Sequence, residues 1–425
     1  MRSRAGLGAG SRRTAPGRLS RGWACAAGLV VALLSWALVR AAGPLPALGP
    51  QDEGFAQVLG PQAFEFPRDH GAHPQYRQEW WYFTGNLDSG AGERVGFELT
   101  FFRFGLAPGA DGAALGTSPP DAGTSGKSAW RARQIYMAHF AVTDVARGRF
   151  RAAEKVSRGG GIGLAGARNP PLRVWVDDWV LEDVGSAIGA PGVAGGVAGD
   201  AGVPSYGHWR LHAAESGYEL TLDAEALLAP VLNGDRGFSV KSGTLGSASY
   251  YYSIPRVVVH GQLIRDGKAV DVSGLAWMDR EWGSGSLGSE QQGWDWFALQ
   301  LRDGSSLMFY SLRGRDGRRD PHSAGTWIGA GGEARPLTAD DVQIDVLDYW
   351  KNPRGERYPA KWHVRVPSAG VDVEVRPVLA DQELTTSTRY WEGAVDVVEG
   401  RSAGETGAAK PAGRGYIELV GYTAQ

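Results

Sequence analysis

Two carboxylates lie two residues apart in the stretch Gly274–Trp282, GLAWMDREW, of the 425-residue chain. They are Asp279 and Glu281, and Trp277 precedes them at the same spacing. Alternate side chains of an extended strand share one face, so neighbours in this set would lie roughly 7 Å apart. A carboxyl group beside a second one in a site with little water has a raised pKa, which an acid catalyst requires. The alternative is a structural strand edge in which Arg280 forms a salt bridge with these carboxylates.

The acid hypothesis gives each of these residues a role. Asp279 would donate a proton, and Glu281 would raise the pKa of Asp279. Trp277 would exclude water and stabilise positive charge through the face of its ring. Arg280 would have to lie on the opposite face of the strand, where it cannot hold Asp279 in its ionised form. We therefore predict Asp279 and Glu281 as catalytic residues.

Aromatic residues concentrate in the same part of the chain and in an earlier stretch around residue 80. Tryptophan and tyrosine side chains with a few amides and carboxylates suit an elongated, mostly apolar ligand that has a polar end. The alternative is that these rings only fill hydrophobic cores. The alternation pattern does not say which strand face lines a core. The predicted ligand-binding residues are Trp80, Tyr82, Tyr250, Tyr252, Trp277, Trp294 and Trp296.

Other catalytic patterns are missing from the sequence. It has no G-x-S-x-G, no H-E-x-x-H, no phosphate-binding loop and no dinucleotide-binding turn. Ser253, His260 and Asp279 contain the residue types of a Ser-His-Asp triad, but nothing in their spacing favours such a triad. The one cysteine, Cys25, lies in the N-terminal apolar segment, so thiolate zinc sites and intramolecular disulfides are excluded. We expect no cofactor and no metal.

The elements that must position these residues are β-strands. The chain has 63 glycines and many aromatic residues, and it lacks a long 3.6-residue hydrophobic period. It also repeats itself, because Trp80–Gly90 matches Trp294–Gly304 without a gap. Further on, Trp209–Leu222 resembles Trp362–Val375. Two matches in the same order predict two tandem domains of one all-β fold, each a small antiparallel barrel.

The first 42 residues form a segment of a different kind. They carry seven arginines, and an apolar run occupies residues 22–39, as in an export signal or a single membrane anchor. We expect a periplasmic protein, released or tethered to the inner membrane by residues 22–39. Residues 43–61 would be a linker, 62–255 the first barrel and 256–425 the second, with long loops at 107–128 and 183–205. Without the seven arginines, 37 basic residues face 46 acidic ones, which disfavours a nucleic-acid partner.

Several stretches resemble a known family. They are HPQYRQEWWYFTGNL, YYYSIPR, VSGLAWMDREWGSG, GWDWFALQLRDG, RYWEGAVDV and GRGYIELVGY, spread over 62–422. Together they resemble the bacterial exported lipocalin-like proteins labelled predicted secreted hydrolases, which are related to carotenoid 1,2-hydratases and AttH-type proteins. The resemblance implies two lipocalin-like barrels in tandem and export. It also suggests association with an ABC-type export system of the inner membrane.

The resemblance bears on the site as well. The hydratases add water to a double bond without a cofactor, and their motif has Tyr-x-Asp-His where this chain has Trp277-Met278-Asp279-Arg280. Only Asp279 carries over. The first functional hypothesis is therefore a carrier or accessory protein that binds an apolar lipid or isoprenoid ligand. The second is a hydratase-like hydro-lyase, or a hydrolase, with Asp279 as general acid.

Overall fold

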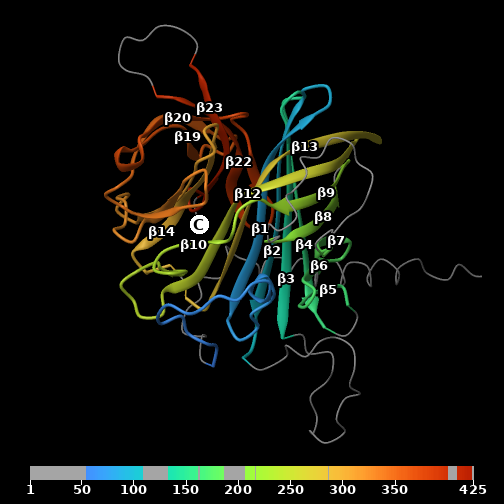
Figure 1. Cartoon of the computed structure of the whole chain (residues 1–425), viewed down its shortest axis with the longest axis vertical. Coiled ribbons are helices and arrows are strands. Elements are labelled where there is room, and N and C mark those ends of the chain that lie inside the picture. Colours follow the sequence, from blue (N-terminus) through green and yellow to red (C-terminus); the bar gives the residue numbers. More distant parts are fainter. Residues whose placement is uncertain are drawn as a thin grey trace, which may run out of the picture.

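The structure is a computed structural model that describes residues 54–108, 133–160, 163–185, 206–215, 217–285, 287–400 and 409–423. Within these residues the chain forms two antiparallel sheets, and helix is limited to the 3₁₀ turns Arg68–His70 (η1) and Pro367–Ala369 (η2). The blue-to-yellow strands of the first sheet lie beside the orange and red strands of the second (Figure 1). The predicted all-β fold is confirmed. The predicted signal or anchor segment lies outside the described residues, as does most of both predicted loops.

The first sheet has 13 strands in the order β4-β3-β2-β1-β13-β12-β9-β8-β7-β6-β5, and β10 and β11 also pair with β12. Its two end strands, β4 and β5, contact each other, so the sheet is a nearly closed barrel. The strands are β1 (Gln78–Ser89), β2 (Arg94–Gly105), β3 (Gln134–Asp144), β4 (Arg149–Gly159), β5 (Ala165–Arg168), β6 (Arg173–Val176), β7 (Trp179–Asp183), β8 (His208–Glu215), β9 (Tyr218–Ala226), β10 (Val231–Leu232), β11 (Phe238–Val240), β12 (Ala248–Arg265) and β13 (Lys268–Gly283).

The second sheet has ten strands in the order β17-β16-β15-β14-β23-β22-β20-β19-β18, and β21 pairs with β22. It curves into a half-barrel. The strands are β14 (Gln291–Leu301), β15 (Ser306–Gly314), β16 (Ala324–Ile328), β17 (Ala334–Thr338), β18 (Gln343–Lys351), β19 (Arg357–Val366), β20 (Val371–Pro377), β21 (Glu383–Thr385), β22 (Arg389–Glu399) and β23 (Pro411–Leu419).

The chain passes from one sheet to the other between Gly283 and Gln291. The expected boundary at residue 255 falls inside β12, which still belongs to the first sheet. In each sheet the last strand returns to pair with the first, β13 with β1 and β23 with β14. The internal sequence repeat has a structural counterpart. The β1–β2 and β14–β15 hairpins occupy equivalent places, and so do the β8–β9 and β19–β20 hairpins.

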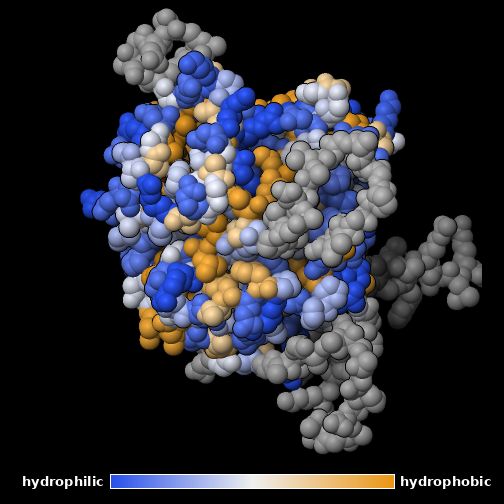
Figure 2. All heavy atoms as spheres, viewed as in Figure 1, coloured by the Kyte–Doolittle hydropathy of each residue, from blue (hydrophilic) through white to orange (hydrophobic). Residues whose placement is uncertain are grey.

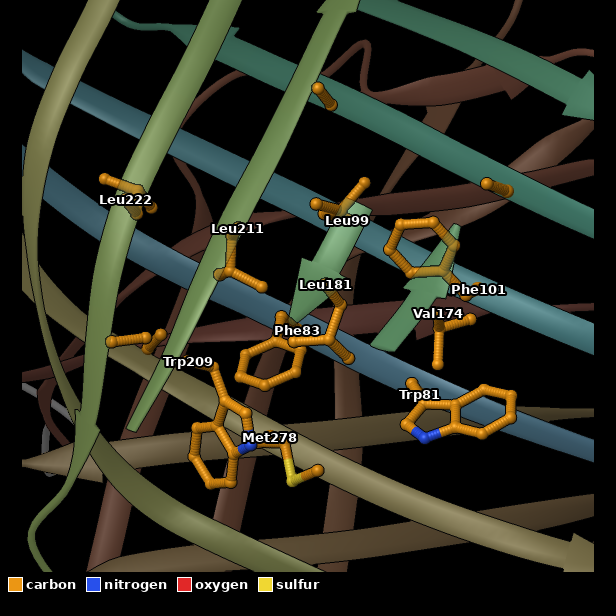
Figure 3. Close-up of a cluster of buried hydrophobic side chains, with 14 of the residues drawn as sticks. Trp81, Phe83, Leu99, Phe101, Val174, Leu181, Trp209, Leu211, Leu222 and Met278 are labelled. Atoms are coloured by element: carbon orange, nitrogen blue, oxygen red, sulfur yellow. The ribbon is translucent and has the colours of Figure 1, made fainter. Parts of the chain in front are cut away.

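Strand alternation divides the aromatic residues between two environments. Phe83 and Leu87 point into the first barrel, and Phe297 and Leu299 point into the second. Both interiors are filled with buried side chains, and Figure 3 shows Trp81, Phe83, Trp209 and Met278 converging in the first. The opposite faces of β1 and β14 turn away from these interiors and lie where the two sheets pack against each other. We call this contact the inter-sheet layer, and its buried apolar members are Tyr82, Val231, Tyr251, Trp277, Trp296, Ala298, Met308, Tyr310, Leu312, Ile328, Ala394 and Tyr416.

Two crossed hydrogen bonds show how the sheets are related. The Asn86 amide on β1 donates to the carbonyl of Gly415 on β23 at 3.0 Å. The Gln300 amide on β14 donates to the carbonyl of Ala276 on β13 at 2.9 Å. Asn86 and Gln300 are equivalent in the repeat, and so are Gly415 and Ala276 by strand register. The inter-sheet layer is thus built around an approximate twofold axis.

The outer surface is mixed in character. Figure 2 shows mainly hydrophilic residues on this face, with apolar residues gathered near its middle. Among the described residues, no helix has both the length and the apolar character needed to cross a membrane.

Candidate functional site

Strand β13 carries the predicted acidic residues into the inter-sheet layer. Asp279, Glu281 and Trp277 are all buried, and alternation places them on the face that meets the second sheet. Asp279 lies between Tyr82 on β1 and Ser253 on β12, its register partners. This position removes the carboxyl from water.

Three donors hold the Asp279 carboxylate. The Tyr251 hydroxyl donates to Oδ2 at 2.5 Å, the Ser253 hydroxyl donates to Oδ1 at 2.5 Å, and the Trp277 indole donates to Oδ1 at 2.7 Å. Burial raises the pKa of Asp279 to about 7, although these three hydrogen bonds act to lower it. The charge of Glu281 adds to the rise but is the smallest of these influences. A carboxyl with such a pKa can both give and accept a proton near neutral pH.

Arg280 lies on the opposite face of β13, inside the first barrel. Its Nη2 is 2.7 Å from Glu79 Oε2, and its guanidinium stacks 3.9 Å above the Trp81 ring. Glu79 also pairs with Arg103 in the same interior. Asp279 takes part in no ion pair among the described residues. The alternative of a salt-bridged strand edge therefore does not apply to Asp279.

Glu281 has a different environment from Asp279. Lys241 Nζ lies 3.1 Å from Glu281 Oε1, and the Ser249 hydroxyl donates to the same oxygen. The same ammonium lies 4.1 Å from the ring centre of Tyr310. Burial acts to lower the pKa of Lys241, but Glu281 and Tyr310 outweigh it and raise that pKa. The site thus contains one carboxyl with a raised pKa and one that is paired with a cation, an arrangement that separates acid and base roles.

A second group of carboxyls lies in the same layer and was missed by the sequence analysis. Glu98 and Glu392 are fully buried, and Glu418 keeps some exposure to solvent. The Tyr82 hydroxyl donates to Glu392 Oε1. Burial raises the pKa of Glu98, raises that of Glu392 well above its ordinary value, and raises the pKa of Glu418 to about 8. Glu392 and Glu418 stand in the quoted stretches RYWEGAVDV and GRGYIELVGY, but only strand register shows that they meet.

The predicted aromatic residues separate into two sets. Tyr82, Trp277 and Trp296 belong to the inter-sheet layer, and Trp80 and Trp294 pack against it. Tyr250 and Tyr252 instead point into the first barrel, where the Tyr252 hydroxyl lies 2.6 Å from His70 Nδ1. Between them in sequence, Tyr251 faces the layer and receives a hydrogen bond from the Trp296 indole at 3.0 Å. The ligand-binding roles of all seven residues stay predictions.

The Ser-His-Asp arrangement considered from the sequence is not formed. Ser253 contacts Asp279, but His260 is exposed on the same strand and takes no part in the site. Among the described residues, no group of three or more His, Cys, Asp or Glu side chains has the geometry of a metal site.

Comparisons with known proteins agree with this architecture. A family model described as AttH-like matches residues 57–422. The crystal structure of an AttH protein from Nitrosomonas europaea is 32% identical, covers 87% of this chain and 100% of its own, and has a TM-score of 0.70. Kievitone hydratase from Nectria haematococca is 13% identical and covers 88% of this chain and 98% of its own. Its TM-score of 0.57 shows a shared fold. None of the curated proteins matches the chain.

Proposed function

The chain belongs to the AttH-like family, and we propose that it is a cofactor-independent hydro-lyase, which adds water to a carbon–carbon double bond or removes it. Asp279 is the general acid of this reaction. The observation that carries the proposal is a carboxyl buried in an aromatic layer, with no cationic partner among the described residues and a pKa raised to about 7. A fold shared with a hydratase is consistent with it.

The proposed chemistry needs an acid that stays protonated near neutral pH. In the direction of hydration, Asp279 gives its proton to one alkene carbon and leaves a positive charge on the neighbouring carbon. The Trp277 indole donates to Asp279, and the Trp296 ring packs against Trp277 in a T-shaped arrangement with ring centroids 6.3 Å apart. Aromatic rings therefore lie next to the place where this charge would form, and such rings stabilise positive charge. Water then adds to the cationic carbon and loses a proton, which yields the alcohol.

The surroundings of Asp279 favour an apolar substrate with a polar end. Aromatic residues of both sheets contribute rings to the layer, while Lys241, Glu281 and the second carboxyl group provide polar contacts at its margins. An acyclic isoprenoid alkene that carries a polar group at one end has this character. We therefore propose isoprenoid alkenes as the substrate class.

Turnover in isotopically labelled water tests the proposal. The purified protein is incubated with acyclic isoprenoid alkenes in heavy-oxygen water, and products are analysed by mass spectrometry. We expect a labelled alcohol from the wild type. Asp279→Asn should lower the rate about 100-fold or more, the usual effect of losing a general acid. The matched control is Asp271→Asn, because Asp271 is an exposed aspartate on the same strand.

Two results would overturn the proposal. One is the absence of a labelled alcohol with the wild type. The other is wild-type turnover by Asp279→Asn while near-ultraviolet circular dichroism shows that the variant is folded.

The carrier hypothesis, the ABC-type export partner and the periplasmic location stay predictions. Side chains fill both sheet interiors and the inter-sheet layer, so a carried ligand and the proposed substrate alike would have to displace packed residues. For the location, residues 22–39 lie outside the described part of the chain.

A further inference from the structure

Strand register gives Asp279 a counterpart in the second repeat. Asp279 pairs with Tyr82 on β1, and Glu418 pairs with Trp296 on β14. Tyr82 and Trp296 are equivalent positions in the repeated sequence. Glu418 therefore occupies in the second sheet the place that Asp279 occupies in the first.

The neighbours of the two carboxyls also correspond. Ser253 pairs with Asp279 across β12 and β13, and Glu392 pairs with Glu418 across β22 and β23. Tyr251 and Tyr390 precede Ser253 and Glu392 by two residues on the same faces. The Trp277 indole donates to Asp279, and Trp294, which matches Trp80 in the repeat, acts to lower the pKa of Glu418. Each repeat thus presents a carboxyl beside a tryptophan to the inter-sheet layer.

Glu98, Glu392 and Glu418 form a second carboxyl centre, and several buried polar atoms around it lack a hydrogen-bond partner among the described residues. Thr84 is fully buried and pairs with Trp277 on one side and with Glu98 on the other, so it lies between the two centres. In the described part of the chain, no donor or acceptor reaches Thr84 Oγ1, and no N–H or hydroxyl donor reaches Glu98 Oε2 or Glu392 Oε2. Leaving a buried polar group unsatisfied costs about 1–3 kcal/mol. A polar group of the substrate, the reacting water molecule, or a proton shared between Glu98 and Glu392 would satisfy these atoms.

The two centres are close enough to act together. The charges of Asp279 and Glu281 both contribute to the raised pKa of Glu418. No lysine or arginine forms an ion pair with Glu98, Glu392 or Glu418 within the described residues, whereas the first centre has Lys241 beside Glu281.

We propose that Glu418, beside Glu98 and Glu392, is the acid–base partner of Asp279, so that each repeat supplies one carboxyl to a single reaction in the inter-sheet layer. This inference rests on the proposed function. The reacting form of the pair holds a single proton, which the two carboxyls share. In hydration, Asp279 transfers that proton to the alkene carbon, the water oxygen bonds to the neighbouring carbon, and the ionised Glu418 takes the proton that this water loses. Return of that proton from Glu418 to Asp279 restores the starting state, and dehydration follows the reverse order.

Infrared difference spectroscopy tests the coupling without a substrate, because protonated carboxyls give separate carbonyl bands. In Asp279→Asn, we expect the Glu418 band to disappear at a lower pH than in the wild type, since a neighbouring charge has been removed. Glu399→Gln is the matched control, because Glu399 is an exposed carboxyl on β22. An unchanged Glu418 titration in Asp279→Asn would overturn the inference.

Turnover of the isoprenoid alkenes in labelled water tests the catalytic role. Glu418→Gln should lower kcat about 100-fold or more and change KM little, as expected for a proton acceptor in the transition state. Glu399→Gln should behave as the wild type. If Asp279→Asn is inactive while folded Glu418→Gln retains wild-type kcat, the proposed function stands and this inference is wrong. If both variants retain activity, both proposals are wrong.

Discussion

The acidity of Asp279 comes mainly from its burial. The sequence suggested Glu281 as the group that raises the pKa of Asp279, and Glu281 does act in that direction, but burial is the larger influence. Lys241 lies beside Glu281 and partly balances its charge. A sequence pattern can identify a pair of carboxylates, but it does not show the cation or the aromatic layer that determines the pKa of each one.

The raised pKa of Asp279 makes a testable contribution to stability. Because the folded-state pKa is about 7 and the ordinary value is 3.8, the folded protein holds this proton more tightly than the unfolded chain. Ionising the buried Asp279 therefore lowers the free energy of unfolding. This loss is absent below about pH 4, grows as the pH rises to about 7, and is constant above that. Asp279→Asn should therefore gain stability over the wild type across this window, by at most about 1.4 kcal/mol for each pH unit.

Urea unfolding at a series of pH values measures this difference. Asp271→Asn should show no comparable pH-dependent gain over the wild type, because Asp271 is exposed. A constant difference between Asp279→Asn and the wild type from about pH 4 to about pH 8 would contradict the burial argument.

At the scale of the elements, alternation predicted the strands and the sharing of faces correctly, as for Trp277, Asp279 and Glu281. It could not say which face of β12 would meet the second sheet. The register between β12 and β13 puts Tyr251 beside Glu281 and turns Tyr250 and Tyr252 into the barrel, so these two predicted ligand-binding residues do not lie in the inter-sheet layer. Three consecutive tyrosines carry no signal that distinguishes the two faces.

Strand β12 therefore offers a matched pair of variants. Tyr251→Phe removes a hydrogen bond that lowers the pKa of Asp279, so this pKa should rise above its wild-type value. Tyr252→Phe removes the contact with His70 on the other face and should leave the titration of Asp279 unchanged. Infrared titration of the Asp279 carbonyl band measures both. Equal effects of the two variants would mean that the faces of β12 are assigned wrongly.

At the scale of the whole molecule, the internal repeat predicted two related sheets, and the structure confirms them. The repeat did not show that the sheets meet through their aromatic faces. This contact joins residues as distant in sequence as Tyr82 and Glu392, and their encounter depends on the curvature and packing of both sheets. For the same reason, the carboxyls of the second sheet could not be assigned to the site from the sequence.

The closeness of the two sheets can be tested at Gly96. A Cβ on Gly96 would lie 2.6 Å from the Cβ of Ala394 on the other sheet. Gly96→Ala should therefore destabilise the protein by about 1–3 kcal/mol, and Ala394→Gly in the same chain should recover part of that loss. Gly90→Ala is the control, since a Cβ there meets no atom within 4 Å. Chemical denaturation of the single and double variants measures the coupling, and strictly additive effects would argue against direct contact.

The crossed hydrogen bonds of Asn86 and Gln300 have a consequence for ancestry. Two copies of one barrel, related by an axis through their contact, have the geometry of a homodimer whose subunits have been joined into one polypeptide. In a true homodimer every substitution occurs in both subunits, so the two carboxyl centres would stay identical. In a single polypeptide this constraint is absent, and one copy has Ser253 where the other has Glu392, and Glu98 where the other has Met308.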